Sequence, residues 1–209
     1  MSKVILFNFN GTIVDTKLLA IDIFNEIASK QGYKKINIEE ISYLSKLSIQ
    51  ERCKVLNVPL YKMPLIGISI KRRYQQYIAS LKPVCGIKEV LEELKSQGYK
   101  LGFLTSNNSN VTNNFLANNS IDFFDYNQYS FNPFSKSKDI SAFLKNHRLK
   151  KEEVIYVGDE LRDIKAGKKN GLVCIAASWG YDSVALLYRG HADFTAKQPT
   201  DILDIILKG

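Results

Sequence analysis

The segment VILFNFNGTIVDT, residues 4–16, decides the fold. Residues 4–9 form a short apolar run, and Asn10-Gly11, a pair typical of turns, ends it. This pattern predicts a buried β-strand that stops abruptly in polar side chains. The polar side chains at this strand end, Asn8 and Asn10, are amides, and neither is an acid.

Similar apolar runs recur along the chain and alternate with helical patterns. Further strands are predicted at residues 100–105, 154–157 and 173–177, and helices at residues 87–97, 135–146 and 163–170. Strands that alternate with helices favour a parallel sheet with helices on both faces. The predicted fold class is therefore α/β, with a three-layer, Rossmann-like core.

One region breaks this alternation. Residues 17–82 carry helical periodicity and no convincing strand, which is too much chain for a simple crossover. We expect residues 16–82 to form a small helical domain, and residues 1–15 and 83–209 to form the α/β domain. The helical periodicity consists of two apolar stripes: Leu18, Ile21, Phe24 and Ile27, and then Ile66, Ile70, Tyr74 and Ile78.

Composition and charge argue against several classes of partner. The 209 residues carry a net charge of +8, but the basic residues occur in short pairs and do not form the long runs of a nucleic-acid-binding tail. No apolar run approaches the ~18 residues that span a membrane, and residues 4–9 are too short for a signal peptide. The three cysteines lie far apart, which predicts a reduced, cytoplasmic protein without a zinc site.

Polar side chains gather where the predicted strands end. Ligands of open parallel sheets bind beyond the carboxyl ends of the strands, so these residues are expected to lie together. They are Asn8, Asn10, Gly11 and Thr12 after the first strand, Thr105, Ser106 and Asn107 after the second, and Asp159, Glu160 and Asp163 after the third, with Lys136 and Lys138 opening the preceding helix.

This set predicts a site for phosphate and a divalent cation. Hydroxyl groups and backbone N–H groups at Thr105 and Ser106 suit phosphate oxygens, and a lysine offsets their charge. Asp159 and Asp163 suit Mg²⁺, which prefers a few carboxylates together with water and phosphate. Each feature has a simpler explanation alone: a hairpin turn, a helix cap or a surface lysine. Their conjunction at strand ends is much more specific, although it lacks a nucleophile.

The sequence resembles haloacid dehalogenase superfamily phosphatases of the phosphoglycolate phosphatase and β-phosphoglucomutase type, which have a helical cap. The resemblance covers essentially the whole chain. NFNGT at residues 8–12 is similar to the family's DxDGT motif except at both acids, and LGFLTSNN matches the second motif at Thr105. Lys136, with Lys138 as the alternative, matches the third motif, and VIYVGDELRD matches the fourth. Residues 16–82 correspond to the cap.

The resemblance implies a role for each position. Asn8 occupies the position of the nucleophile and Asn10 that of the general acid/base, while Lys136 orients the nucleophile. Thr105, Ser106, Asn107 and Lys136 would bind phosphate. Mg²⁺ would be held at Asn8, at the Asn10 backbone carbonyl, and at Asp159 with support from Asp163.

Two amides in these positions change the expected chemistry. An amide oxygen is a poor nucleophile and an amide does not shuttle protons near neutral pH, so hydrolysis should be severely impaired. We expect weakened Mg²⁺ binding and retained binding of a small phosphorylated metabolite. Inactivating changes in an active phosphatase lineage and a natural non-catalytic binding protein both fit. A hydrolase is favoured over a mutase, and a monomer or a homodimer is expected.

Overall fold

The computed structural model describes residues 4–130 and 135–208, and its centre is a six-stranded parallel sheet. The strand order is β3-β2-β1-β4-β5-β6. Phe7 of β1 lies opposite Phe103 of β2 and Val157 of β4, so these three strands end at the same edge of the sheet. The strands are β1 (Val4–Asn8), β2 (Lys100–Thr105), β3 (Tyr126–Tyr129), β4 (Val154–Gly158), β5 (Val173–Ala177) and β6 (Phe194–Ala196).

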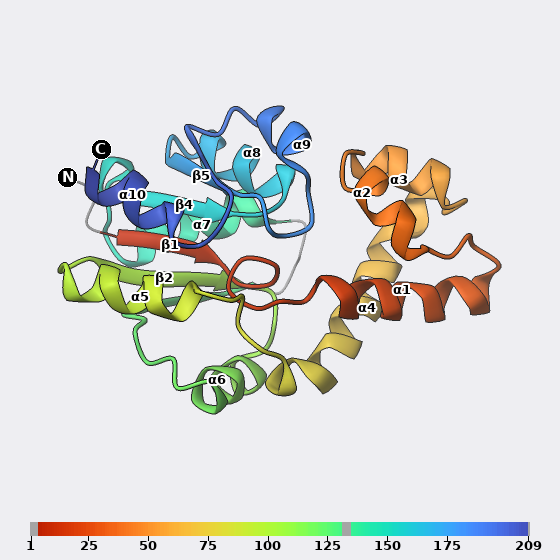
Figure 1. Ribbon diagram of the computed structural model, residues 1–209, viewed down its shortest axis with the longest axis horizontal. Coiled ribbons are helices and arrows are strands. Elements are labelled where there is room, and N and C mark those ends of the chain that lie inside the picture. The colour runs from red at the N-terminus through yellow and green to blue at the C-terminus, as the bar shows by residue number, and fades with distance from the viewer. Residues whose placement is uncertain (1–3, 131–134, 209) are drawn as a thin grey trace.

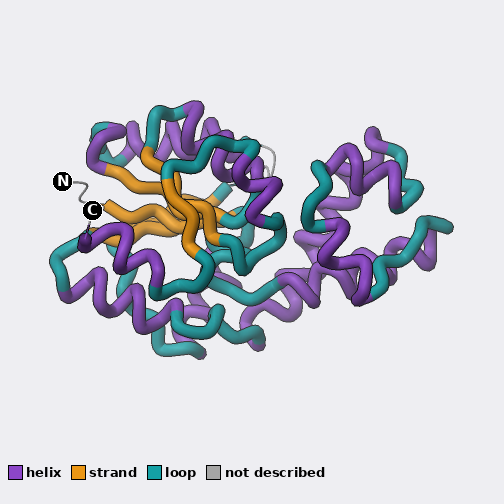
Figure 2. The backbone as a smooth tube through the Cα atoms, turned by 45° about the horizontal axis from the view of Figure 1, so that its top comes forward, coloured by secondary structure: helices purple, strands orange, loops and turns teal. Residues whose placement is uncertain are grey.

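Helices cover both faces of the sheet, as Figures 1 and 2 show. Ile5 and Phe7 of β1 belong to the core cluster on the face of α5 (Ile87–Ser96), α6 (Ser109–Asn118) and α10 (Asp201–Lys208). Val4 and Leu6 belong to the cluster on the other face, with α7 (Lys136–Asn146), α8 (Leu161–Lys169) and α9 (Val184–Tyr188). Successive side chains of a strand point to opposite faces, and both faces of β1 are buried. The three-layer α/β prediction is confirmed.

The helical insertion stands beyond the carboxyl edge of the sheet (Figure 1, right). It contains α1 (Lys17–Gln31), α2 (Ile41–Leu44), α3 (Ile49–Val55) and α4 (Met63–Tyr77), with short 3₁₀ turns at Ile38–Glu40, Leu60–Lys62 and Ile78–Ser80. We call residues 16–82 the helical unit. The chain leaves the sheet and returns to it at adjacent points, since the Asp15 N–H donates to the Lys82 carbonyl at 3.2 Å.

The helical unit has a core cluster of its own, which includes Phe24, Leu44 and Ile66. Of the two predicted stripes, the one on α4 is largely buried, with Tyr74 at 7% and Ile78 just beyond the helix at 0% exposure. On α1 the Leu18 side chain is 65% exposed and lies outside this core. In the described part of the chain, no helix combines the length and apolarity needed to cross a membrane.

Candidate active site

Asn8, the last residue of β1, has a side-chain amide held by three partners. Its Nδ2 donates to the Asn10 backbone carbonyl and to Asp159 Oδ1, both at 2.8 Å. Its Oδ1 accepts from Lys136 Nζ at 3.1 Å. An ammonium group only donates and a carbonyl only accepts, so these partners define the orientation of the amide. The N–H groups of Asn8 must therefore point towards Asp159 and the Asn10 carbonyl, and its oxygen towards Lys136.

Asp159 follows β4 and lies at the centre of the polar cluster, fully buried. Its Oδ1 also accepts from the Thr12 hydroxyl at 2.8 Å, and its Oδ2 accepts from the Tyr181 N–H at 3.0 Å. Burial is the main cause that raises the pKa of this carboxyl, the charges of Asp163 and Glu160 add to the effect, and the resulting pKa is about 7. Asp159 is thus a crowded, desolvated acid that the surrounding N–H and O–H donors only partly compensate.

The turn after β1 brings the backbone against this carboxylate. Gly11 has a φ of +83°, a conformation that L side chains rarely adopt, and a Cβ there would lie 2.2 Å from Asp159 Oδ2. A Cβ on Gly180, from the loop after β5, would lie at the same 2.2 Å. Glycine at both positions is what allows the two loops to close around Asp159.

Asp163, in the first turn of α8, holds Lys136 and the preceding loop in place. Its buried Oδ2 accepts from the backbone N–H groups of Asp159 and Glu160 at 3.2 and 3.0 Å. Its Oδ1 forms an ion pair with Lys136 Nζ and accepts from the Tyr156 hydroxyl at 3.3 Å. The groups that contact the Asp163 carboxylate are the Lys136 ammonium, the Tyr156 hydroxyl and two backbone N–H groups. Asp163 therefore holds Lys136 and the loop between β4 and α8 in position.

The remaining predicted residues lie after β2. Thr105 and Ser106 line a cavity together with Asn8, Asn10 and Lys136. The Asn107 side chain donates to Asn10 Oδ1 at 2.9 Å and does not line that cavity. Helix α6 begins only at Ser109, capped by Asn108, so Thr105 and Ser106 are not helix caps. The alternative Lys138 is exposed and does not line the cavity either.

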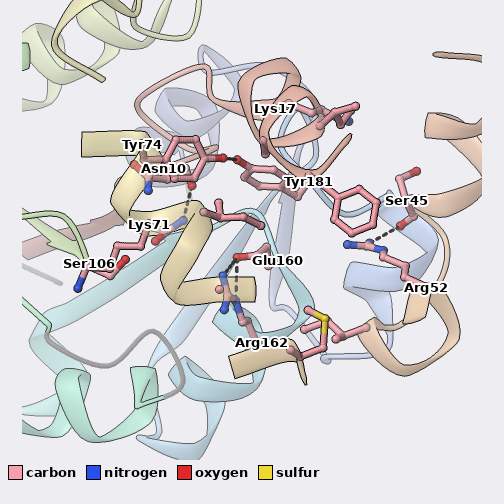
Figure 3. Close-up of a pocket in the computed structure, with 18 of the residues that line it drawn as sticks. Asn10, Lys17, Ser45, Arg52, Lys71, Tyr74, Ser106, Glu160, Arg162 and Tyr181 are labelled. Atoms are coloured by element: carbon pink, nitrogen blue, oxygen red, sulfur yellow. Dashed lines mark hydrogen bonds and ion pairs between the residues drawn. The ribbon is translucent and has the colours of Figure 1, made fainter. Parts of the chain in front are cut away.

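The cavity lies between the strand ends and the helical unit and has a volume of about 330 Å³ (Figure 3). The polar residues of the strand ends form its floor, and the helical unit forms its roof. Three residues that the sequence did not predict for this site also line it: Lys17, Arg162 and Tyr181. Tyr74, predicted only as part of an apolar stripe, and Arg52 line it as well. Tyr181 lies in the loop after β5, so the rule that ligands bind at strand ends was available to find it.

Contacts between the helical unit and the sheet domain hold the roof of the cavity over its floor. The Tyr74 and Tyr181 hydroxyl groups are 2.5 Å apart, and Tyr181 also contacts the Thr16 hydroxyl at 2.7 Å. Arg52 forms an ion pair with Asp182, whose side chain is only 7% exposed. Since Tyr181 also donates its N–H to Asp159, the position of the helical unit is linked directly to the central carboxylate.

The donor set around Asp159 fits a magnesium ion poorly. The Asp159 carboxylate and the Asn10 carbonyl are suitable oxygen ligands, but the Asn8 N–H groups already occupy the space between them. For Asn8 to offer its oxygen to a cation, the amide would have to turn its N–H groups towards the Lys136 ammonium. Among residues 4–130 and 135–208, no group of three or more His, Cys, Asp or Glu side chains is arranged to hold a metal ion.

Comparison with known proteins agrees with this fold. The chain belongs to the haloacid dehalogenase-like hydrolase family, whose model matches residues 5–177. It is 25% identical to a phosphoglycolate phosphatase from Synechococcus elongatus over 98% of this chain and 97% of that protein. It is 26% identical to a putative pyrophosphatase PpaX from Clostridium perfringens, over 100% and 99% of the two chains.

Solved structures share the whole architecture. A predicted phosphatase from Clostridium acetobutylicum superposes with a TM-score of 0.80 at 19% identity, with both chains covered completely. This likeness extends over the helical unit as well as the sheet. The chain therefore has the fold of this family from end to end, with amides in its first strand-end motif.

Proposed function

We propose that this chain binds a small phosphorylated metabolite between the strand ends and the helical unit, and that it hydrolyses phosphate esters very slowly. The observation that carries the proposal is the Asn8 amide, which stands at the end of the central strand with its oxygen on Lys136 and its N–H groups on Asp159. Here an amide replaces the carboxylate that family members use as a nucleophile, while the polar surroundings of that position are retained.

We further propose roles for the residues around it. The hydroxyl groups of Thr105 and Ser106 donate to phosphate oxygens, and the Lys136 ammonium neutralises their charge. Asn107 holds the Asn10 side chain in place and contacts the ligand only through it. Residues 16–82 act as the cap domain, and residues 1–15 and 83–209 act as the domain that carries the strand-end residues.

The same geometry supports the proposed loss of turnover. The amide oxygen of Asn8 lacks the negative charge of a carboxylate, and its lone pairs face the Lys136 ammonium. Asn10, whose side chain pairs with Asn107, has no proton to give to a leaving oxygen near neutral pH. Magnesium, which family members use to polarise the phosphoryl group, binds weakly in this proposal because of the Asn8 orientation. Asp159 is the acid that would hold it, with support from Asp163, which fixes the loop before α8.

Restoring both acids tests the proposal. Hydrolysis of p-nitrophenyl phosphate by the wild type and by the Asn8→Asp/Asn10→Asp double variant is compared with and without MgCl₂. We expect the double variant to be at least ~10⁴-fold faster, and only with magnesium, since each lost role costs a factor of this size. A wild type as fast as the double variant would contradict the proposal. A double variant that stays inactive while both proteins bind phosphate would favour a lineage of binding proteins.

A further inference from the structure

The cavity roof differs sharply from its floor. The floor carries Asn8, Asn10, Thr105, Ser106 and Lys136, whereas the roof is formed mostly by apolar side chains of the helical unit. These include Ile21 and Phe24 of α1, Ile41 and Leu44 of α2, and Met63 and Ile70 of α4. A ligand with its phosphate on the floor would therefore place the rest of its structure against a hydrocarbon surface.

The cationic side chains near the roof are already engaged by the protein. Lys17 donates to the Gly180 carbonyl at 2.8 Å. Arg52 pairs with Asp182, and its Nε donates to the Leu44 carbonyl at 2.8 Å. Figure 3 shows the guanidinium of Arg162 directed at Glu160, to which its Nη2 donates at 2.6 Å. Lys71 is not a free cation either.

These pairings disfavour a ligand that carries a second anionic group. Arg52 and Arg162 each already face an acid, Asp182 or Glu160, that neutralises the guanidinium charge. A ligand carboxylate beside either guanidinium would meet the like charge of that acid, and drawing the guanidinium away would leave the acid unpaired in a largely desolvated place. A hydrocarbon group needs no such partner, and its transfer from water to the roof is favourable in itself.

We infer that the ligand of this site is a phosphomonoester of an apolar alcohol, with the phosphate at the strand ends and an aliphatic or aromatic group under the helical unit. This inference rests on the proposed function and specifies its substrate class. The name of the phosphoglycolate phosphatase relative implies, for that protein, a substrate that carries a carboxylate as well as a phosphate. The ligand inferred for this chain carries no carboxylate.

The size of the cavity limits the apolar group. The volume of the cavity is about 330 Å³. An engineered apolar cavity of about 150 Å³ is known to hold benzene, so the cavity in this protein has room for a phosphate and one ring or a short alkyl chain. Long lipid chains would not fit within it.

A calorimetric series on the full wild-type chain tests the inference. The probes are inorganic phosphate, then methyl, ethyl, propyl, butyl and phenyl phosphate, and finally phosphoglycolate. We expect the Kd to fall about fourfold for each added methylene until the cavity is full. Ethyl phosphate and phosphoglycolate form a matched pair, because both carry a two-carbon group and only the second has a carboxylate. We expect ethyl phosphate to bind at least ~10-fold more tightly.

A matched pair of variants locates the apolar contact. Ile21 and Ile27 are both half-buried on α1, but only Ile21 lines the cavity. The Ile21→Thr variant should weaken butyl phosphate binding about tenfold and leave inorganic phosphate binding unchanged. The Ile27→Thr variant should leave both unchanged. Thermal unfolding of both variants checks that each remains folded.

The possible outcomes separate this inference from the proposed function. If no probe binds to the folded chain, inorganic phosphate included, the proposed function itself is wrong. If inorganic phosphate binds but the Kd is flat along the alkyl series, or phosphoglycolate binds more tightly than ethyl phosphate, the phosphate site stands and the apolar substrate class is overturned. An Ile21→Thr variant with unchanged butyl phosphate binding would overturn it as well.

Discussion

Replacing Asn8 by aspartate should destabilise the protein strongly in the absence of magnesium. The substitution keeps the shape of the side chain but places a carboxylate oxygen 2.8 Å from Asp159 Oδ1 and from the Asn10 carbonyl, where N–H groups now donate. Two hydrogen bonds worth about 1 kcal/mol each are lost. Two carboxylates with charge centres about 4 Å apart repel each other by roughly 4 kcal/mol at an effective dielectric constant of 20.

Lys136 offsets part of this cost, because its Nζ lies 3.1 Å from Asn8 Oδ1 and would then face a charged oxygen. We assign about 3 kcal/mol to that gain, which leaves a net loss of roughly 3 kcal/mol. In a chain of this size the unfolding temperature should fall by about 6–12 °C. The measurement is thermal unfolding of the wild type and of Asn8→Asp in EDTA at pH 7 and at pH 9.5. Because the pKa of Asp159 is already about 7, the second carboxylate raises it further, so Asp159 takes up a proton at pH 7 and most of the repulsion is present only at pH 9.5.

Magnesium should reverse this effect in the variant only. A cation between the two carboxylates recovers about 2.7 kcal/mol when its concentration is 100 times its Kd. The wild type, whose Asn8 N–H groups already satisfy Asp159, should shift by less than about 2 °C. The control is Asn10→Asp, whose half-buried side chain pairs with Asn107 and should change stability by less than ~1 kcal/mol. The reasoning fails if Asn8→Asp is as stable as the wild type in EDTA, or if magnesium stabilises both proteins equally.

Two further predictions concern the turn after β1 and the cysteines. Gly11→Ala should destabilise the protein by at least ~2 kcal/mol more than Gly32→Ala. Both glycines have a positive φ, but of the two only Gly11 would bring a Cβ against Asp159. Equal losses of stability in chemical denaturation would contradict this close approach of the Gly11 backbone to Asp159. A thiol reagent at pH 8 should label one cysteine in the native protein and three after denaturation. Cys85 is exposed, whereas Cys53 and Cys174 are buried, and burial raises the pKa of the Cys174 thiol to about 12. Rapid labelling of more than one native thiol, measured by intact mass, would refute this.

The sequence predicted the central strands well because burial on both faces gives them an unbroken apolar pattern. The segments at residues 4–9, 100–105, 154–157 and 173–177 correspond to β1, β2, β4 and β5. The strand β3 was not predicted, because its sequence YNQY is polar and because it is a partly exposed edge strand. The strand β6 was not predicted because it has only three residues and is the opposite edge. Edge strands lack the two-sided burial that makes central strands recognisable.

The candidate site shows the same limit at the level of side chains. Topology predicted that Asn8, Thr105 and Asp159 converge, because the strands that carry or precede them end at one edge. The choice of Lys136 over Lys138 came from the resemblance to the family's third motif. The direction of the Asn8 amide and the contact of Tyr181 with Asp159 depend on loops whose close approach no local pattern encodes. The apolar roof was equally hidden, since a residue such as Ile21 that lines a cavity has the same periodicity as one that fills a core.

The most direct test of the phosphate pocket at the strand ends is a titration of inorganic phosphate in EDTA, with the wild type and with Lys136→Gln. We predict one site per wild-type chain without any metal, and binding weakened at least ~30-fold in the variant, because the charge-assisted hydrogen bonds of the ammonium are lost. A folded wild type that binds no phosphate, or a Lys136→Gln variant that binds it as tightly, would contradict the account.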